Sequence, residues 1–398
     1  MRKGSKTVVI YMDVMERYYF FKRFFKPLSK NSNVCVITAR LSISVLCKLQ
    51  GIKVYLLRNI DTKKKSYDFL ENSLSVLNNY HAKNEANIIY SMVQHQLILL
   101  KKEIDIESFF LWNGSTTIGI CIGNFAKECD LKRYYFEISN LGKKIFVDKE
   151  GVNAQSYLYH HPDILDNVHI NNESFKKWRE HWKRDTESPK QVKNTTRIPF
   201  SFLIDLLGFY IFNILREDRR SSMNVMKRKF SLKCSFSSID ISNDLPSYFI
   251  FFAMQVTNDS QLLINSEINN LEALKIAKEL SKKERVSLVV KLHPAEMNIP
   301  FIKSIEAMYR NKAFILSNLS TKELIEKSQK VIVINSTVGL EAMINEKELI
   351  VLGRALYKEF NFDRLKAYIF DYLVDIDYFD KEEKVSIATL KKILEKNV

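Results

Sequence analysis

Three polar blocks in the C-terminal part of the chain each follow an apolar run of strand length: QVTNDSQ at 255–261, KLHP at 291–294 and NSTVGLEAM at 335–343. A short apolar run closed by turn-forming residues predicts a buried strand, and the helix-like sequence after the third block predicts a strand–turn–helix unit. Because the carboxyl ends of parallel strands share one edge of a sheet, we expect the blocks to lie together there. An acid, a histidine and a helix start at such an edge favour an enzyme that handles an activated, negatively charged small molecule.

Residues 1–140 alternate short β-rich runs with longer helical patterns, which predicts βαβ units and a parallel sheet. The strand-like runs are 7–12, 33–39, 53–59, 107–114 and 132–139. The segment 66–104 contains many helix formers and no proline, so it predicts one long helix or two consecutive helices.

From residue 246 the same alternation returns. Strand-like runs lie at 247–256, 286–294, 313–318, 330–336 and 348–353, and helical patterns lie near 268–283, 300–310, 320–329 and 337–345. With 398 residues, of which 46% are hydrophobic, the chain can bury two cores. We therefore predict an α/β fold of the GT-B-like class, in which two Rossmann-like domains, 1–158 and 246–398, face a central cleft with their parallel sheets and are joined by a helical connector, 159–245.

The connector is basic and aromatic, with FKKWREHWKR at 175–184 and REDRRSSMNVMKRKF at 216–230. Between them, the longest apolar stretch (199–215) is interrupted by Asp205 and is marginal for crossing a bilayer, which takes about 20 residues. It is interpreted as a buried or interfacial helix. A packed helical insertion and a helix that docks on a membrane both fit this composition.

The chain carries 61 Lys and Arg against 46 Asp and Glu, a formal charge of +15, which favours anionic partners such as nucleotide sugars, anionic lipid surfaces or nucleic acid. The N-terminal sequence MRKGSKTVVIYMDV has no signal-peptide cleavage pattern, so the protein is expected to stay inside the cell. The five cysteines form no closely spaced pair, which predicts reduced thiols and argues against a zinc site. They are Cys35, Cys47, Cys121, Cys129 and Cys234.

The block at 335–339 is predicted to be a strand-to-helix turn, in which Asn335, Ser336 and Thr337 can cap the helix and Gly339 permits close approach. Backbone N–H groups and the helix dipole at such a turn can bind a phosphate, although an ordinary capped helix start has the same sequence. Glu341 in the first turn could accept hydrogen bonds from ribose hydroxyls or only complement the dipole.

In the KLHP block, His293 and Lys291 lie at the end of a strand, where they could contact a phosphate or leaving group. Asp259 is either a helix N-cap or a functional acid. Glu137 ends a strand of the first domain in the same way, so the two carboxylates could serve glycosyl transfer with retention. Asp375-Ile376-Asp377 matches the DxD pattern of metal-dependent glycosyltransferases, but no phosphate-binding turn lies near it, so a metal site is not expected.

Taken together, the blocks resemble the capsule-polysaccharide β-Kdo transferase family, which moves 3-deoxy-D-manno-octulosonic acid (Kdo) from CMP-Kdo. The resemblance covers about residues 135–360. Within the family, the chain is most similar to single-module members that place the first Kdo on a lyso-phosphatidylglycerol lipid. The matching blocks, in family order, are FE at 136–137, FVDKEGVNA at 146–154, QVTNDSQ at 255–261, KLHP at 291–294, NSTVGLEA at 335–342 and LGRALY at 352–357.

The resemblance implies a retaining GT-B-type transferase that needs no metal or other cofactor, with an acceptor-side first domain and a nucleotide-sugar-binding last domain. It implies Asp259 as nucleophile, Glu137 as acid or base and His293 at the CMP phosphate. The implied substrate-binding residues are Gln255, Asn258, Ser260, Lys291, Asn335, Ser336, Thr337, Gly339, Glu341, Tyr357 and Asn153. After Glu137 the family often has a glycine and an aromatic, where this chain has Ile138-Ser139-Asn140, and this difference bears on the acceptor.

The resemblance further implies a lipid or glycan acceptor, a peripheral position at the inner face of the cytoplasmic membrane, and other capsule biosynthesis proteins as partners. One alternative is a GT-B-type transferase or epimerase that uses a different nucleotide sugar. A second alternative is a basic scaffold for membranes or nucleic acid. The chain has no common nucleic-acid-binding motif and its basic residues are spread along the sequence, so nucleic acid is not expected as a partner.

Overall fold

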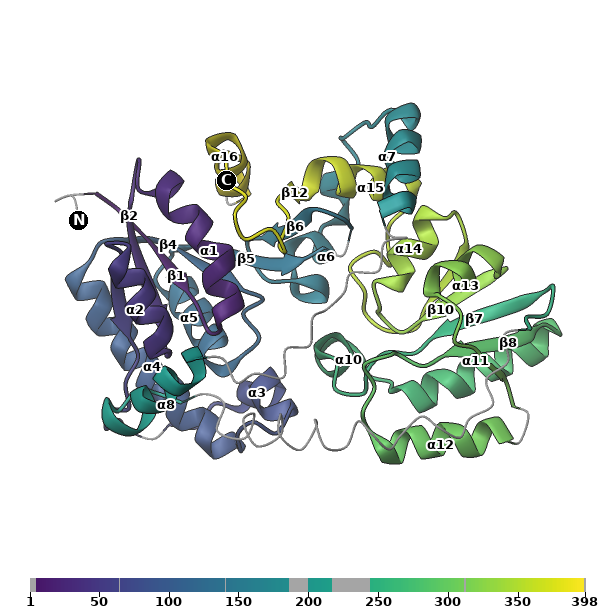
Figure 1. The fold of residues 1–398 in the computed structure, drawn as a ribbon, viewed down its shortest axis with the longest axis horizontal. Coiled ribbons are helices and arrows are strands. Elements are labelled where there is room, and N and C mark those ends of the chain that lie inside the picture. The colour runs from purple at the N-terminus through teal and green to yellow at the C-terminus, as the bar shows by residue number, and fades with distance from the viewer. Residues whose placement is uncertain are drawn as a thin grey trace. The chain divides into compact units, whose positions relative to one another are not determined.

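The computed structural model describes residues 5–63, 65–139, 141–185, 200–216, 244–310 and 313–396. The chain forms two compact units, and each contains an α/β sheet (Figure 1). The N-terminal unit comprises Met1–His161, Asn167–Arg219 and Ala367–Val398, and the C-terminal unit comprises Pro162–Asp166 and Arg220–Lys366. The predicted α/β class is confirmed.

The N-terminal unit is built on a seven-stranded sheet with the order β12-β6-β5-β4-β1-β2-β3. The first five strands of the chain are parallel, whereas β6 and β12 are antiparallel to their neighbours. The strands are β1 (Thr7–Tyr11), β2 (Asn33–Thr38), β3 (Lys53–Leu56), β4 (Ile106–Trp112), β5 (Lys132–Ile138), β6 (Lys144–Asp148) and β12 (Val374–Asp375). All five strands predicted in residues 1–140 are present, and β6 and β12 were not predicted.

One core of this unit lies between the sheet and helix α1 (Met15–Leu28), whose phenylalanines recur at helical spacing. Phe20, Phe21 and Phe24 are fully buried and pack edge-on against Phe136 and other rings of the sheet. The other helical segments are α2 (Leu41–Leu49), η1 (Asp68–Asn72), α3 (Leu74–Leu77), α4 (Lys83–Glu103), α5 (Thr117–Glu128), η2 (Asn153–Gln155), α6 (Tyr157–His160), α7 (Asn172–Asp185), α8 (Phe200–Ile211), η4 (Tyr368–Tyr372) and α16 (Ile387–Glu395).

The C-terminal segment corrects the predicted division of the chain, because residues 367–398 belong to the N-terminal unit and not to the last domain. Strand β12 extends the first sheet, and Val374, Leu390 and Ile393 are buried in the same core as α1. Their apolar side chains explain the arrangement, since α16 buries one face that the first sheet and α1 cover. The chain crosses between the units within α15 (Phe362–Ala367).

The C-terminal unit has a fully parallel five-stranded sheet with the order β11-β10-β7-β8-β9. Side chains alternate between its two faces: Ile250 and Phe252 belong to one core cluster, and Phe249 and Phe251 belong to the other. Both faces are therefore covered, as parallel sheets require. The strands are β7 (Phe249–Ala253), β8 (Ser287–Lys291), β9 (Ile315–Leu316), β10 (Lys330–Val333) and β11 (Glu348–Val351).

The helices of this unit are η3 (Pro162–Leu165), α10 (Ser260–Asn265), α11 (Asn270–Glu284), α12 (Ile299–Arg310), α13 (Thr321–Lys327) and α14 (Val338–Ile344). The four helices predicted in this unit are present as α11 to α14, and α10 follows Asp259, for which a helix N-cap was one of the two predicted roles. In chain order, the five parallel strands of each unit are arranged 3-2-1-4-5. The order reverses between β1 and β4 in one sheet and between β7 and β10 in the other, and such switch points are where open α/β sheets bind ligands.

Helix α8 lies in the predicted connector and packs on α2 in an unusual way. It buries its polar side: Asp205 accepts a hydrogen bond from the backbone N–H of Ser42 (2.9 Å), and Gly208 fits against Leu41. Four of its apolar side chains are half-buried, and five are exposed, namely Phe200, Leu203, Leu207, Tyr210 and Ile211. No helix in the described parts of the chain is long and apolar enough to cross a membrane. Residues 217–230 of the basic segment lie outside the described residues.

Candidate active site

Two buried amide side chains join the strands that flank the switch point of the C-terminal unit. Gln255 follows β7 and Asn335 follows β10; Gln255 Nε2 donates to Asn335 Oδ1 (2.9 Å), and the Asn335 backbone N–H donates to Gln255 Oε1 (3.1 Å). Asn335 Nδ2 also donates to the carbonyls of Gln261 (2.8 Å) and Asn265 (3.2 Å). The structure thus gives both amides a role in holding the two predicted blocks together. Direct contact of either amide with a substrate stays a prediction.

Asp259 is half-buried and caps α10, which matches one of the two roles open from the sequence. Its Oδ1 accepts from the N–H of Gln261 (2.7 Å). Within the described residues Oδ2 accepts no hydrogen bond, so one carboxylate oxygen is available for chemistry. The neighbouring predicted residues are Asn258, which is exposed, and Ser260, which begins the helix.

Glu296 was not identified from the sequence, yet it holds the loop that precedes Asp259. Its buried carboxylate accepts from the N–H and hydroxyl of Thr257 (2.7 and 3.1 Å) and from the N–H groups of Met297 and Asn298 (both 2.8 Å). The loops after β7 and β8 are therefore fastened to each other by one side chain. The sequence around Glu296 could not have predicted this role, because an acid shortly after a His-Pro pair has many possible partners.

The KLHP block places His293 on the surface and Lys291 partly inside the protein. The Ala295 N–H donates to His293 Nδ1 (3.1 Å), so in the neutral imidazole Nε2 carries the proton and can donate to a ligand. Lys291 Nζ donates to the carbonyl of Leu319, and burial lowers the pKa of the ammonium group. This contact ties β8 to the loop after β9, so Lys291 has a positioning role in the structure.

The predicted phosphate turn differs in detail from the expected capped helix. Thr337 occupies the N-cap position of α14 without a side-chain cap. Instead, the Ser336 hydroxyl accepts from Val338 N–H (3.2 Å), and the Ser336 carbonyl accepts from Gly339 N–H (3.0 Å). The N–H groups of Ser336 and Thr337 have no acceptor in the described part of the chain, so these two donors remain for an anion.

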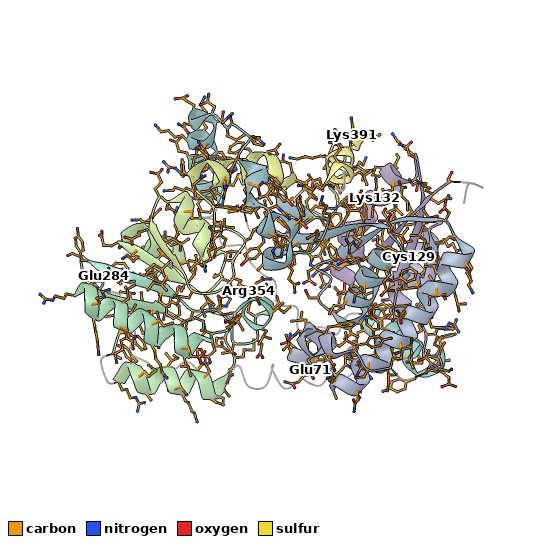
Figure 2. All side chains as sticks on the ribbon, turned by 180° about the vertical axis from the view of Figure 1, so that it is seen from behind. Glu71, Cys129, Lys132, Glu284, Arg354 and Lys391 are labelled. Carbon is orange, nitrogen blue, oxygen red and sulfur yellow. The ribbon has the colours of Figure 1, made fainter. Side chains whose placement is uncertain are left out.

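Tyr357 is buried beneath this turn and explains its glycine. The tyrosine hydroxyl donates to the carbonyl of Ser336, and burial raises the pKa of the phenol. A Cβ atom on Gly339 would overlap the Tyr357 ring, so only glycine fits against it. Arg354 of the same LGRALY block donates to the carbonyl of Ile264 on α10 (3.0 Å), and Figure 2 labels its position. This block therefore supports both the turn and α10.

Glu341 lies in the first turn of α14, and burial raises the pKa of its carboxyl group to about 7. Near neutral pH this group exists as a mixture of acid and carboxylate, and it can therefore donate or accept a hydrogen bond. Such a group suits contact with hydroxyls of a ribose or sugar.

The switch point of the N-terminal unit contains a second polar cluster, which sequence reasoning missed. Asp13 follows β1, its Oδ1 is shielded from solvent without a hydrogen-bond donor in the described residues, and burial raises its pKa despite the nearby Arg17 and Arg40. The Arg17 guanidinium stacks on Trp112 at the end of β4 (4.0 Å to the ring centroid) and donates to the Tyr378 hydroxyl. The signal that could have found Asp13 is its position directly after the first buried strand.

Glu137 and Asn153 also belong to the N-terminal unit. Glu137 is half-buried on β5, opposite Phe146 of β6, and its Oε1 accepts from the N–H of Ile138 (3.0 Å). Asn153 begins η2 with a positive φ of 54°. The loop containing Asn153 is organised by buried Asp148, which accepts from the N–H of Tyr157 (2.9 Å) and the hydroxyl of Tyr372 (2.7 Å).

The DxD pattern has a structural explanation in the fold. Asp375 on β12 forms an ion pair with Lys144 of the neighbouring strand, and Asp377 caps its own turn by accepting from the N–H of Phe379 (2.9 Å). The described residues contain no group of three or more His, Cys, Asp or Glu side chains that could hold a metal ion.

The C-terminal switch point thus combines one available carboxylate oxygen, an imidazole donor, two N–H groups and a titrating acid. The family model described as capsule polysaccharide biosynthesis protein matches residues 122–361, which is more than half of the 398 residues. The chain belongs to this family. The resemblance drawn from the motif blocks is confirmed at this level, and the matched region includes the three C-terminal blocks and Glu137.

Individual relatives match shorter parts of the chain. Escherichia coli capsule polysaccharide export protein KpsS is 31% identical over 127 residues, which are 29% of this chain and 33% of that protein. Protein FixF of Sinorhizobium fredii (strain NBRC 101917 / NGR234) is 32% identical over 122 residues, which are 29% of this chain and 28% of that protein. The matched regions therefore span a third or less of these curated relatives.

Among solved structures, Thermosulfurimonas dismutans KpsC, β-Kdo 2,7 transferase, aligns with 98% of this chain and 100% of its own, at 14% identity and a TM-score of 0.46. The UDP-GlcNAc 2-epimerase of Neisseria meningitidis aligns with 98% of this chain and 90% of its own, at 13% identity and a TM-score of 0.27.

Proposed function

We propose that this family member is a retaining glycosyltransferase that moves β-Kdo from CMP-Kdo to an acceptor in capsular polysaccharide synthesis. The observation that carries the proposal is the convergence of the motif blocks at the C-terminal switch point, within a chain that belongs to the capsule polysaccharide biosynthesis family. An open parallel sheet binds nucleotides at this position, and the side chains present there suit an anionic donor.

The CMP phosphate is placed at the turn before α14. The N–H groups of Ser336 and Thr337 would donate to it, and Nε2 of His293 would stabilise the negative charge that develops as CMP leaves. Glu341 would contact a nucleotide hydroxyl. The proposal includes no metal ion, because the backbone N–H groups and the imidazole N–H would donate hydrogen bonds to the leaving phosphate.

Asp259 is the proposed nucleophile. Its free Oδ2 would form a bond to the anomeric carbon of Kdo while the bond from that carbon to the CMP phosphate oxygen breaks. In the second step the acceptor hydroxyl would attack the same carbon and release Asp259, and Glu137 would take the hydroxyl proton. Two displacements retain the anomeric configuration.

The acceptor is proposed to be a lipid, lyso-phosphatidylglycerol, or a capsular glycan. The support for a lipid comes from α8, whose exposed Phe200, Leu203 and Leu207 would enter the interface of a bilayer without spanning it. The protein would then act at the inner face of the cytoplasmic membrane, beside other capsule biosynthesis proteins.

Asp259→Asn provides the sharpest test, because asparagine is also a good N-cap and should keep α10 folded while removing the nucleophile. CMP-Kdo generated in situ is offered with fluorescent lyso-phosphatidylglycerol or capsular glycan, and products are read by mass spectrometry. We expect a Kdo-sized mass increment with the native chain and its loss by at least about a thousandfold in Asp259→Asn, with CMP affinity unchanged.

The matched control is Glu267→Gln, which removes an exposed carboxylate just after α10 and should retain transfer. Near-native turnover by Asp259→Asn would reject the nucleophile assignment. Binding of UDP-sugars with no binding of CMP would reject the donor, and the enzyme would then belong to another class of nucleotide-sugar enzymes.

A further inference from the structure

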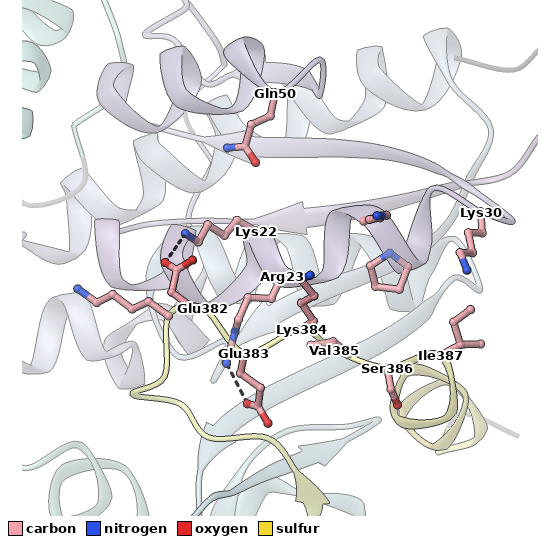
Figure 3. Close-up of a pocket in the computed structure, with 13 residues that line it drawn as sticks. Lys22, Arg23, Lys30, Gln50, Glu382, Glu383, Lys384, Val385, Ser386 and Ile387 are labelled. Atoms are coloured by element: carbon pink, nitrogen blue, oxygen red, sulfur yellow. Dashed lines mark hydrogen bonds and ion pairs between the residues drawn. The ribbon is translucent and has the colours of Figure 1, made fainter.

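A basic pocket of about 420 Å³ lies in the N-terminal unit, along the C-terminal half of α1 (Figure 3). One wall is the outer face of α1, and the other is the strap 381–387 that leads into α16. This volume is within the range of small-molecule sites, about 300–1,000 Å³. We call it the lysine pocket; its charged lining residues are Lys22, Arg23, Lys26, Lys30, Lys381, Lys384, Glu382 and Glu383.

Two rows of lysines face this pocket. Lys22, Lys26 and Lys30 are four residues apart and therefore form one stripe along α1 and its end, while Lys381 and Lys384 come from the strap. Like charges at this helical spacing destabilise a helix by a few tenths of a kcal/mol per pair. A stripe of like charge at this spacing therefore favours an anion beside it.

The acids of the pocket are already engaged. Glu382 pairs with Lys22 (3.5 Å), and Glu383 pairs with Arg23 (3.1 Å). In the described part of the chain, Lys26 and Lys384 pair with no acid. After these pairs are formed, the pocket retains an excess of positive charge.

Arg23 forms the buried side of the pocket, with only 2% of its side chain exposed. Its Nη1 donates to the carbonyls of Asp377 (2.8 Å) and Asp380 (2.6 Å), which holds the strap against α1. Its Nη2 is shielded from solvent and has no acceptor in the described residues. Buried donors without an acceptor are uncommon in proteins, and an oxyanion in the pocket would supply the missing acceptor.

We propose that the lysine pocket binds a phosphate-bearing anion, either a free diphosphate or the phosphodiester headgroup of an anionic lipid. Lysine ammonium groups bind phosphate as mobile point charges, and several of them can surround one group of oxygens. The inference does not depend on the proposed transferase reaction, because it concerns a different surface of the N-terminal unit.

The test compares the full chain with a double variant, Lys26→Gln with Lys30→Gln, which removes two exposed lysines of the pocket. The control is Lys101→Gln with Lys102→Gln, two exposed lysines at the end of α4 in the same unit, which leave the same net charge. Inorganic pyrophosphate binding is measured by calorimetry with excess CMP present, and vesicle binding is measured by co-sedimentation with phosphatidylcholine vesicles that contain or lack phosphatidylglycerol.

We expect the pocket variant to weaken binding by at least about tenfold and the control variant to change it by less than about twofold. Pocket-dependent binding of pyrophosphate would identify a free diphosphate as the ligand type. Pocket-dependent binding only to vesicles with phosphatidylglycerol would identify a lipid headgroup. Absence of both, or equal losses in the two double variants, would overturn the proposal.

Discussion

Several predicted site residues make contacts that hold the fold together. Gln255 and Asn335 come from strands 80 residues apart and satisfy each other's amides, and Tyr357 supports the Ser336 carbonyl from below. Glu296 fastens the loops after β7 and β8. Glu341 differs from these residues, because burial raises its pKa and no side chain or backbone N–H in the described residues donates a hydrogen bond to its carboxylate.

Glu341→Gln is expected to make folding less dependent on pH. The carboxyl pKa is about 7 in the folded chain and 4.5 as the ordinary value, so the protonated form is favoured by folding. The contribution of this carboxyl group to native stability is therefore highest below pH 4.5, falls as the pH rises from 4.5 to 7, and is constant above 7. One pKa unit corresponds to about 1.4 kcal/mol. Between about pH 5 and 8, the free energy of unfolding of the native chain should therefore fall by about 2–3 kcal/mol relative to that of the variant.

Urea unfolding followed by circular dichroism at about pH 5 and about pH 8 measures this difference. Equal pH dependence of the native chain and Glu341→Gln would show that the carboxyl group titrates normally. Glu323→Gln is a suitable control, because that acid forms an exposed ion pair with Lys327 on α13.

The sequence predicted the elements better than the contacts between them. Each predicted strand is an apolar run whose side chains lie in a core or against it, so local pattern and burial agree. Strand β12 has two residues and α10 has six, too short for a period to be visible. The Asp13–Arg17 cluster was missed because its partner Tyr378 is 361 residues away from Arg17. Local sequence patterns do not reveal contacts between residues so far apart in the chain.

The turn before α14 and the loop after β11 act as one packed element, because the Tyr357 ring occupies the space that a side chain on Gly339 would need. Gly339→Ala should therefore destabilise the C-terminal unit by about 1–3 kcal/mol. The cost should be smaller in a Tyr357→Leu background, where the ring is absent, and should persist in a Tyr357→Phe background, where it remains.

A double-mutant cycle by thermal unfolding measures this coupling. If Gly339→Ala costs the same in all three backgrounds, the glycine is required for a reason other than the tyrosine ring. Binding of CMP to each variant then shows whether the turn also shapes the nucleotide site.

At the scale of the whole molecule, the N-terminal unit is assembled from distant parts of the chain. Residues 367–398 extend its sheet and complete its core, although residues of the other unit precede them. Nothing in the local sequence of this segment distinguishes packing on the first sheet from packing on the second, so the predicted boundary at 246–398 was wrong at its C-terminal end. The pairing of β12 with β6 and the burial of Leu390 and Ile393 beside α1 decide it.

Ile393→Ala is expected to destabilise the N-terminal unit by about 2–5 kcal/mol, since Ile393 is fully buried in the core beside α1. Ile387→Ala on the same helix should change stability by less than about 0.5 kcal/mol, because that side chain is 52% exposed. All three tryptophans, Trp112, Trp178 and Trp182, lie in this unit, so fluorescence during urea unfolding reports on it selectively. An equal effect of both variants would contradict the assignment of residue 393 to this core.

The discontinuous N-terminal unit also constrains the order in which a newly made chain can fold. Residues 246–366, which form the second sheet, leave the ribosome before residues 374–393 are available to the first. Domains generally fold as units during synthesis, and the N-terminal one usually comes first. In this protein the N-terminal unit is synthesised first but can be completed only last. Part of its aromatic core stays uncovered until translation has passed Ile393. Its exposure to chaperones and proteases during synthesis should therefore outlast that of the C-terminal unit.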